Sequence, residues 1–592
     1  MALLPQAKSV LQEVGGGVGS NLTLVAILSV MQKGPVGSVA LFQKASDIQT
    51  VYGLGEGLAL AQMYLSTVKQ QVLFGGLSSA GVGAAAAAIK NADVSRVLGT
   101  SAITFTGTPF DDEDIVVLVN VGGTIGSAGI QISVSRDGGI LFSGQIRLGT
   151  ATTYVIPNTG ITVNFGAGTL LAGDTAECWC DSAKPGAADI QAGFTAIANS
   201  PFLPRIVVVC GDIPDQTHLL NITGPVSSLE TVNGRYTHVI CSARDFLHPA
   251  IMQNPLNVQT IAFAATTLTR SAGSFVTDGF QVGQWVYIQG SLTPANNGFF
   301  GPITAVTATI LTLGGAAFTV AAAASSITLV ATEPKVAWKA AVEAVVGATP
   351  STQVISHRTV CFGGRATKLD ANGYRKRRPA AWPFVIAEMQ HDIQVSPAQV
   401  DSGPLAGWQL ATTATATTSA PVNTGNPGSA PNVGTLPPLD YDERADGGLL
   451  AYRVACLCTV DDFAGIYVAL PVTLDNDNAP LSRLPVGLVG DLYQTIVKQA
   501  TTLKLSSRIE LNNDGTAKEK EAQRIEKYVV GQLSANLLTR KAEGQRASAV
   551  DWAFPRNIDL RTPGTLVNCE GGYVPLGYLE QINTNVYVRT GS

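Results

Sequence analysis

The sequence predicts an α+β multidomain protein with a mixed α/β core, two inserted all-β domains of the sandwich or barrel type, and extended terminal arms. Three observations predict this fold class. The chain has 592 residues, enough for roughly four domains of about 150 residues. Continuous β-branched runs alternate with helical patterns, which indicates a sheet buried on both faces. Two long stretches contain only short β runs separated by turn signals, which indicates inserted all-β domains.

The core begins after a short arm. Residues 1–22 are small and Gly-rich, and we expect an N-terminal arm with Gly15–Gly17 as its hinge. Residues 23–96 form the first part of the predicted core. The apolar run Leu22–Met31 predicts a buried strand, and Glu56–Lys69 predicts a helix because its apolar residues recur at helical spacing.

Two predicted β domains interrupt this core. Residues 97–185 contain a series of short β runs, and residues 257–333 contain a second series with a hairpin-turn signal at Asn296-Asn297-Gly298. Residues 186–256 and 334–400 return to alternating helix and strand patterns. We therefore expect a middle α/β domain that is split by the second insertion, as tolerated domain insertions typically are.

The last part of the chain starts with a linker. Residues 401–445 are rich in Thr, Ala and Pro, which predicts a loop or linker. Residues 446–577 predict a C-terminal inner domain with helices at Gly490–Leu503 and Lys518–Lys541. Residues 578–592 are expected to form a final strand and arm.

The composition indicates a protein that works in an assembly. Charged residues make up 14% of the chain, against about 25% in typical soluble domains, and poorly charged surface is usually covered. The net charge of −5 argues against bulk nucleic-acid binding. No apolar run reaches the roughly 18 residues of a membrane span. The first residues lack the basic start of a signal peptide.

Motifs that would indicate an enzyme are missing from the sequence. It holds no P-loop, no H-E-x-x-H and no G-x-S-x-G pattern, and none of its histidines stands at metal-ligand spacing with another. Gly53-Leu-Gly55-Glu-Gly57 lacks the full dinucleotide spacing and predicts a turn. We expect no catalytic residue, no cofactor and no metal. An enzyme built from loop carboxylates in the β insertions is a minor alternative.

Two Cys-x-Cys pairs stand out, Cys178/Cys180 and Cys456/Cys458. Both cysteines of such a pair face the same side of a strand. Inert buried thiols are the main interpretation. A disulfide between subunits and a metal site are the alternatives, although structural zinc sites prefer Cys-x-x-Cys spacing.

Charged clusters occur at three places. Tyr374-Arg-Lys-Arg-Arg378 is a dense basic run, for which a solvated loop or an inter-subunit ion pair is favoured over nucleic-acid binding. Asp111-Asp112-Glu113-Asp114 is acidic. Asp475-Asn476-Asp477-Asn478 breaks the EF-hand pattern, because Ala479 and Pro480 stand where a ligand and Gly belong.

Four pieces of the chain point to one family by their order. Gly34-Pro35-Val36-Gly37 is followed by a short strand and a helix that ends at Tyr52-Gly53. Thr153–Phe165 and Phe275–Asn297 are β modules, and a long helix followed by Pro555-Arg-Asn557 and closing strands ends the chain. This order resembles the contractile tail sheath proteins of myovirus-type bacteriophages, distant kin of pyocin and type VI secretion sheaths.

The resemblance implies a structural subunit without enzymatic activity. Such subunits polymerise as stacked six-membered rings around a tail tube and contract to drive the tube through the host envelope for genome ejection. The implied partners are further copies of the chain, the tail tube protein, and baseplate and tail terminator proteins, with no direct contact to nucleic acid or membrane. The implied location is the virion, after synthesis in the host cytoplasm.

Two sets of contact residues follow from the resemblance. Terminal arms add strands to the sheets of neighbouring subunits, and we expect Val586, Tyr587 and Val588 in such a strand. In related sheaths a C-terminal helix faces the tube. This helix carries four basic residues that would contact an acidic tube surface, with a solvated helix face as the alternative; they are Lys518, Lys520, Arg524 and Lys527.

The main alternative is another structural virion protein, such as a baseplate, tube or decoration subunit with glycan-binding β domains. A tube subunit is expected to be smaller and almost entirely β. The helix–strand alternation at 187–250 and 334–361 counts against a tube subunit.

Overall fold

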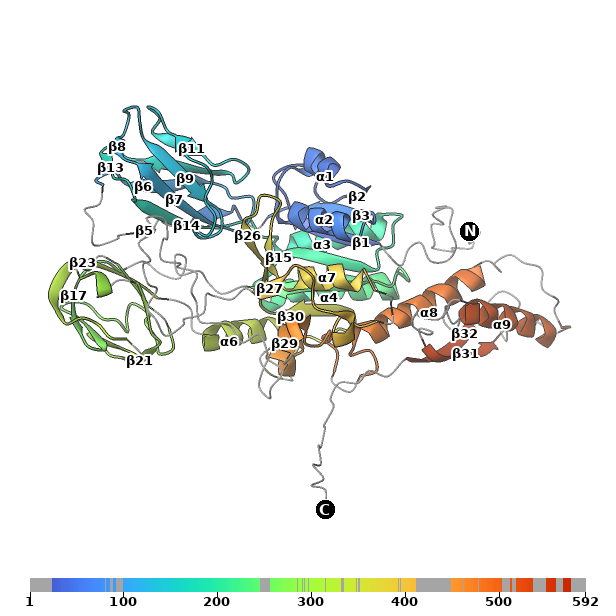
Figure 1. The fold of residues 1–592 in the computed structure, drawn as a ribbon. Coiled ribbons are helices and arrows are strands. Elements are labelled where there is room, and N and C mark those ends of the chain that lie inside the picture. Colours follow the sequence, from blue (N-terminus) through green and yellow to red (C-terminus); the bar gives the residue numbers. More distant parts are fainter. Residues whose placement is uncertain are drawn as a thin grey trace, which may run out of the picture.

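The centre of the molecule is a seven-stranded mixed sheet (Figure 1). This computed structural model describes residues 24–575, with gaps at single or paired residues and at 86–88, 92–98, 245–255, 332–334, 411–448, 503–509, 514–517, 536–549 and 560–567. Its strands, in spatial order, are β2 (Val39–Phe42), β3 (Val72–Leu77), β1 (Val25–Val30), β15 (Ile206–Ile213), β16 (His238–Ala243), β24 (Thr359–Phe362) and β28 (Val454–Ala455). All neighbours run parallel except β2 and β3.

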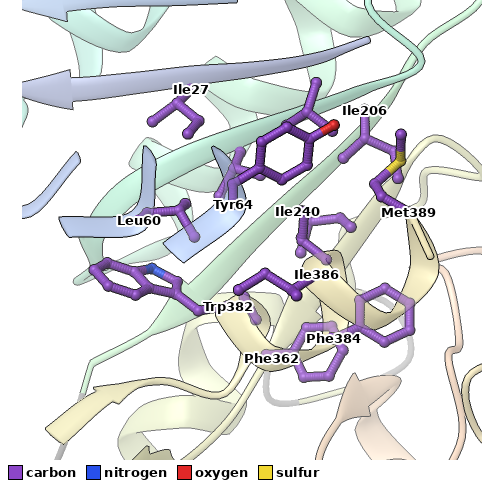
Figure 2. Packing of buried hydrophobic residues seen from close by; sticks show 14 of the residues in the cluster. Ile27, Leu60, Tyr64, Ile206, Ile240, Phe362, Trp382, Phe384, Ile386 and Met389 are labelled. Atoms are coloured by element: carbon purple, nitrogen blue, oxygen red, sulfur yellow. The ribbon is translucent and has the colours of Figure 1, made fainter. Parts of the chain in front are cut away.

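The sheet is covered by helices on both faces. Ile27 and Val208 belong to the core on one face, and Leu28 and Val207 to the core on the other, which explains why β1 and β15 begin with continuous apolar runs. Helices α1 (Ala45–Tyr52), α2 (Glu56–Thr67) and α7 (Ala381–Glu388) cover the first face. Helices α3 (Ala187–Asn199), α4 (Gln216–Thr231) and α6 (Lys335–Val346) cover the second. Figure 2 shows this first core, with Leu60 of α2 beside Trp382 of α7 and the ring of Tyr64 extending toward Ile206.

The first β domain is a sandwich. Its main sheet has the order β10-β9-β7-β14-β4, with β5 also paired to β14, and smaller sheets β11-β12-β6 and β13-β8 complete it. Val117 and Ile132 from the main sheet share a core with Val163 from the second sheet. The strands are β4 (Ala84–Ala85), β5 (Ile89–Asn91), β6 (Ile103–Gly107), β7 (Glu113–Val121), β8 (Gly123–Thr124), β9 (Gln131–Ser135), β10 (Ile146–Arg147), β11 (Thr153–Val155), β12 (Ile161–Phe165), β13 (Thr169–Leu170) and β14 (Thr175–Asp181).

The second β domain is a curled sheet of the order β20-β19-β23-β17-β18-β22-β21. Strands β20 and β21 stand at opposite ends of this order, yet only Gly301 and Pro302 separate them in the chain. The sheet must therefore curl like a barrel, and Phe263 and Phe275 lie in its core. The strands are β17 (Leu256–Ala264), β18 (Thr267–Arg270), β19 (Val286–Gln289), β20 (Gly298–Phe300), β21 (Ile303–Val306), β22 (Ile310–Leu313) and β23 (Ala321–Ala331).

Two further units attach to the core. Strands β25 (Arg365–Leu369) and β26 (Arg375–Pro379) form a hairpin, here called the tongue, which also pairs with β27 (Gln409–Leu410). The C-terminal unit extends away from the core along the long helix α8 (Figure 1). It comprises α8 (Leu484–Thr502), α9 (Glu519–Leu533) and the antiparallel pair β31 (Val550–Asp559) and β32 (Asn568–Pro575), and the pair β29 (Leu457–Val460) and β30 (Phe463–Val468) precedes it.

The architecture agrees with the predicted class in its coarse form, a mixed α/β protein with a large mixed sheet and several smaller antiparallel sheets. Strands from the predicted segments 23–96, 186–256, 334–400 and 446–577 all lie in one central sheet. The arms at 1–22 and 578–592, and residues 411–445 of the linker 401–445, lie outside the described residues.

Candidate functional site

Charged side chains gather at the carboxyl edge of the central sheet. In doubly wound sheets this edge binds ligands where the strand order reverses, and here the reversal lies between β1 and β15. Glu56 begins α2, Asp212 lies near the end of β15, and Arg365 begins the tongue. Arg365 forms an ion pair with Asp212. The edge thus carries opposite charges supplied by the chain itself.

Lys184 connects this edge to the first β domain. Its Nζ lies 3.8 Å from Glu56 and donates hydrogen bonds of 2.8 and 2.7 Å to the two carboxylate oxygens of Asp112. Burial alone would lower the pKa of Lys184, but Asp112 and Glu56 outweigh it and raise that pKa above its usual value. Burial raises the pKa of Glu56 to about 7 in spite of Lys184. Lys184 is therefore a firmly charged ammonium group between the two domains.

The acidic cluster and the basic run singled out in the sequence meet in space. Arg378 donates hydrogen bonds of 2.5 and 2.6 Å to Asp111, and Lys376 lies 3.2 Å from Glu113. The expectation of a solvated loop at 374–378 is wrong, and an inter-subunit ion pair there stays a prediction. The run forms strand β26, and the side chains of Lys376 and Arg378 pair with carboxylates of the first β domain in the same chain.

These pairs form a charge ladder with the period of a strand. Successive side chains of a strand point to opposite sides, so Lys376 and Arg378 share one face, and both are buried. Asp111 and Glu113 have the same spacing of two. Burial alone would raise the pKa of Asp111, but Arg378 outweighs it and holds that pKa below its usual value. The spacing thus matches two cations to two anions.

The ladder continues through the main chain. The Arg375 amide donates to Asp137 Oδ2 at 3.1 Å, and Lys376 Nζ donates to the Arg136 carbonyl at 3.0 Å. Arg136 in turn donates to Glu113 through Nε at 2.7 Å. The tongue is therefore held by side chains and backbone together.

Asp112 points to the other side and binds the linker into α3. Its Oδ1 accepts hydrogen bonds from the amide and the hydroxyl of Ser182, at 2.8 and 2.7 Å. Burial alone would raise the pKa of Asp112, but Lys184 outweighs it and lowers that pKa. The linker that connects the β domain to α3 is thus fixed by the domain's own acidic cluster.

The fourth acidic residue, Asp114, pairs with another carboxyl group. Asp114 on β7 and Glu177 on β14 share a side-chain hydrogen bond, so at least one of them carries a proton. Burial raises the pKa of Asp114 to about 6, and burial together with Asp114 raises the pKa of Glu177 well above its usual value. Both strands of this pair belong to the β domain, and the charges of Arg377 and Lys376 in the tongue partly oppose the rise in the pKa of Asp114.

A second charged junction connects α8 to the central sheet. Arg358, which is 3% exposed, donates to the two oxygens of Glu230 in α4 at 3.0 and 2.7 Å and forms an ion pair with Asp491 in α8. His238 Nδ1 lies 3.0 Å from Asp491. Burial lowers the pKa of His238 although Asp491 opposes the change. One arginine thus holds three elements together.

The predicted basic residues lie on the exposed side of α9. Lys518 is the N-cap, and all four of Lys518, Lys520, Arg524 and Lys527 are exposed. Arg524 pairs with Glu521 at 2.7 Å, and Lys518 with Glu510 at 3.0 Å. Apolar residues at positions 525, 529 and 533 face the opposite way, against α8. The exposed position suits tube contact and a solvated face alike, and tube contact stays a prediction.

The remaining predicted contact residues are the four paired cysteines and the residues of the C-terminal strand. Cys178, Cys180, Cys456 and Cys458 are thiols and at most 2% exposed, a placement that favours the interpretation as buried cysteines. A disulfide between subunits stays a prediction. Val586, Tyr587 and Val588 lie outside the described residues.

The junctions are mechanical in character. In the part of the chain that the structure describes, no group of three His, Cys, Asp or Glu side chains is placed to hold a metal ion, and no helix there has the length and apolarity to cross a membrane. Sequence reasoning found both charged clusters but missed their pairing. The usable signal was the matched spacing of two between Asp111/Glu113 and Lys376/Arg378.

No protein-family model matches the chain, and no curated protein matches it. Among solved structures, a sheath tail protein of Listeria innocua is 11% identical, with 94% of this chain and 96% of that chain covered and a TM-score of 0.36. A sheath tail protein of Desulfitobacterium hafniense is 10% identical, with coverage of 96% and 99% and a TM-score of 0.37. A chain of the anti-feeding prophage baseplate is 10% identical, with coverage of 69% and 76% and a TM-score of 0.33. Over nearly its whole length, this chain is therefore similar in structure to sheath tail proteins.

Proposed function

We propose that this chain is a structural, non-enzymatic subunit of a contractile phage tail sheath. In this proposal it polymerises as stacked, six-membered rings around a tail tube and contracts to drive the tube through the host envelope for genome ejection. The observation that carries the proposal is the architecture of the core. The central sheet takes strands from both sides of the two inserted β domains, with β1 near the start of the described residues and β28 after the second domain. The sequence resemblance leads us to expect this arrangement in a sheath subunit.

Self-association is proposed to use the C-terminal unit. Strands β31 and β32 pair with each other and, among the described residues, with no third strand, so their outer backbone edges can accept one. An arriving strand would gain main-chain hydrogen bonds, each contributing about 0.5–1.5 kcal/mol net. We propose that residues 578–592 of a neighbouring subunit supply it through Val586, Tyr587 and Val588. A few such bonds keep subunits linked while their bodies move between two packings.

The tube-facing surface is proposed to be the basic side of α9. Lys520, Arg524 and Lys527 follow each other at helical spacing and are exposed together. Cations in this arrangement attract an acidic tube surface and steer its approach. Baseplate and tail terminator proteins are the further partners at the two ends of the sheath.

Electron microscopy of the purified chain tests the proposal. A sheath subunit is expected to form hollow tubes or stacked rings with a helical repeat, alone or after addition of its tail tube protein. The proposal fails if only monodisperse single particles are seen, with tube protein added and across a range of salt concentrations.

A further inference from the structure

Among the described residues, the first β domain is joined to the core by two covalent connections and by a non-covalent contact. The chain enters the domain through residues 78–83 and leaves it through residues 182–186, on either side of a sandwich with its own core. Domains joined only by short linkers are expected to move relative to each other. The non-covalent contact is made by the tongue, which lies between this domain and the core (Figure 1).

The tongue contact fixes an orientation because its charges are buried. Arg378 and Lys376 are each 4% exposed at their side chains, opposite Asp111 at 16% and Glu113 at 1%. A buried charge without its partner is strongly unfavourable. Any swing or slide of the domain would separate both pairs at once, so the ladder permits one register.

The exit linker, residues 182–186, is held by Asp112, which lies between Asp111 and Glu113 in the acidic cluster. Asp112 binds Ser182 and Lys184, and Lys184 reaches Glu56 in the core. Asp112 alternates with Asp111 and Glu113 along the chain, so one short segment holds the tongue on one side and the linker on the other. Movement at the linker is therefore coupled to movement at the tongue.

We infer that residues 111–113, together with Lys184, Lys376 and Arg378, form a latch that holds the first β domain in one orientation on the core, and that opening the latch lets the domain swing on its two linkers. This inference does not depend on the sheath proposal. It assigns a joint function to two charged clusters that are 260 or more positions apart in the chain.

Distance measurements on the full chain test the latch. Spin labels are placed at Val155→Cys in the β domain and Val232→Cys after α4, positions 64% and 66% exposed, in a Cys569→Ser background with the buried cysteines left in place. Labelled chains are diluted into an excess of unlabelled chains, so that only distances within one chain are read. The parent should give one narrow distance distribution. Arg378→Asp, which places like charges together, should broaden or shift it.

Charge exchange makes the test specific. Arg378→Asp combined with Asp111→Arg restores opposite charges and should restore the narrow distribution, whereas Arg147→Asp, at an exposed arginine of the same β domain, should leave it unchanged. A narrow, unshifted distribution in Arg378→Asp overturns the latch, and so does a failure of the exchanged pair to restore it. If Arg378→Asp does not fold, Arg378→Gln is measured with the same labels, and an unshifted distribution there overturns the latch equally.

Discussion

At the scale of single residues, buried charges in this protein stand where separate parts of the chain meet. Arg358, Arg378 and Lys184 each bind carboxylates from an element distant in sequence. Replacing a whole buried ion pair by apolar residues is often neutral, but removing one partner leaves an uncompensated charge. Such residues therefore specify which surfaces meet, and their loss is costly.

Arg358 offers the clearest test of this cost. In Arg358→Ala, Glu230 and Asp491 lose their common cation, and we expect the free energy of unfolding to fall by about 3–5 kcal/mol. Urea denaturation measures it. Arg524→Ala, at an arginine whose side chain is 59% exposed, is the control and should change stability by less than about 0.5 kcal/mol. Similar losses in both variants would contradict the role of burial.

Two glycines of the Gly34–Gly37 turn form a matched pair for a second test. Both have positive φ, 98° at Gly34 and 67° at Gly37, so alanine is strained at either by roughly 1–2 kcal/mol. A Cβ at Gly34 would also lie 2.7 Å from the Tyr52 ring and 2.8 Å from the Val51 carbonyl oxygen. A Cβ at Gly37 would have no neighbouring atom within 4 Å. We expect Gly34→Ala to lower the urea midpoint clearly more than Gly37→Ala. Equal midpoints would show that the ring yields without cost.

The pair of Asp114 and Glu177 predicts a pH dependence. Burial raises both pKa values, to about 6 for Asp114 and further for Glu177, whereas the unfolded chain releases these protons near pH 4. The folded state binds the extra proton, so the stabilisation is complete below about pH 4 and is lost as the pH rises through 6 and beyond. Urea midpoints should therefore fall more between pH 4 and pH 8 in the parent than in Glu177→Gln. Parallel curves for the two proteins would contradict the shared proton.

At the scale of elements, the sequence predicted what local patterns can encode. The helix predicted at Glu56–Lys69 is observed as α2, because its apolar spacing matches a buried helix face. Helix α8 begins earlier than the predicted Gly490, at Leu484. Pro485 is tolerated in a first turn, and a Cβ at Gly487 would lie only 2.7 Å from His238 Nε2. Pro485 and Gly487, residue types that usually interrupt helices, are therefore compatible with the first turn of α8 and with its close approach to His238.

Strand β26 shows why the rest could not be predicted. Its consecutive cations give no apolar alternation, the usual signal of a half-buried strand, and its buried face is covered by Asp111 and Glu113 from a distant part of the chain. A local pattern contains no information about a partner more than 260 positions away. The spacing of two in both clusters was visible in the sequence, but it became meaningful only once the fold placed them opposite each other.

Helix α9 carries a prediction of its own. Lys520→Glu combined with Arg524→Glu reverses the charge of its exposed side, and we expect co-sedimentation with the tail tube protein to be lost while circular dichroism stays unchanged. Gln523→Glu, at an exposed position of the same helix, is the control for added negative charge. Undiminished co-sedimentation of the double variant would refute a tube contact at this surface.

At the scale of the whole molecule, rigid and open parts are separated. The three-layer core, the latched first β domain and the Arg358 junction hold the central mass together. The two-stranded sheet of the C-terminal unit, which extends away from the core along α8, offers backbone edges (Figure 1). For the proposed sheath, such a division predicts that subunits change from one packing to another as rigid bodies while strand contacts link them.

The proposed strand exchange through residues 586–588 can be tested with substitutions in that segment alone. Val586→Pro combined with Val588→Pro removes backbone donors from the proposed augmenting strand, and we expect polymerisation to be abolished in negative-stain micrographs. Val586→Ala combined with Val588→Ala keeps the donors and should polymerise. Normal tubes from the proline variant would contradict strand exchange at these positions.

The curled second β domain has a consequence for engineering. Its first and last strands, β17 and β23, are antiparallel neighbours, with Leu256 paired opposite Leu329, so the points where the chain enters and leaves lie side by side. A domain with adjacent termini can be exchanged without stretching the scaffold that carries it. We therefore expect that this domain can be replaced by a reporter or an antigen whose termini are equally close together. A polymer of such a fusion would carry the inserted domain at the spacing of its own lattice.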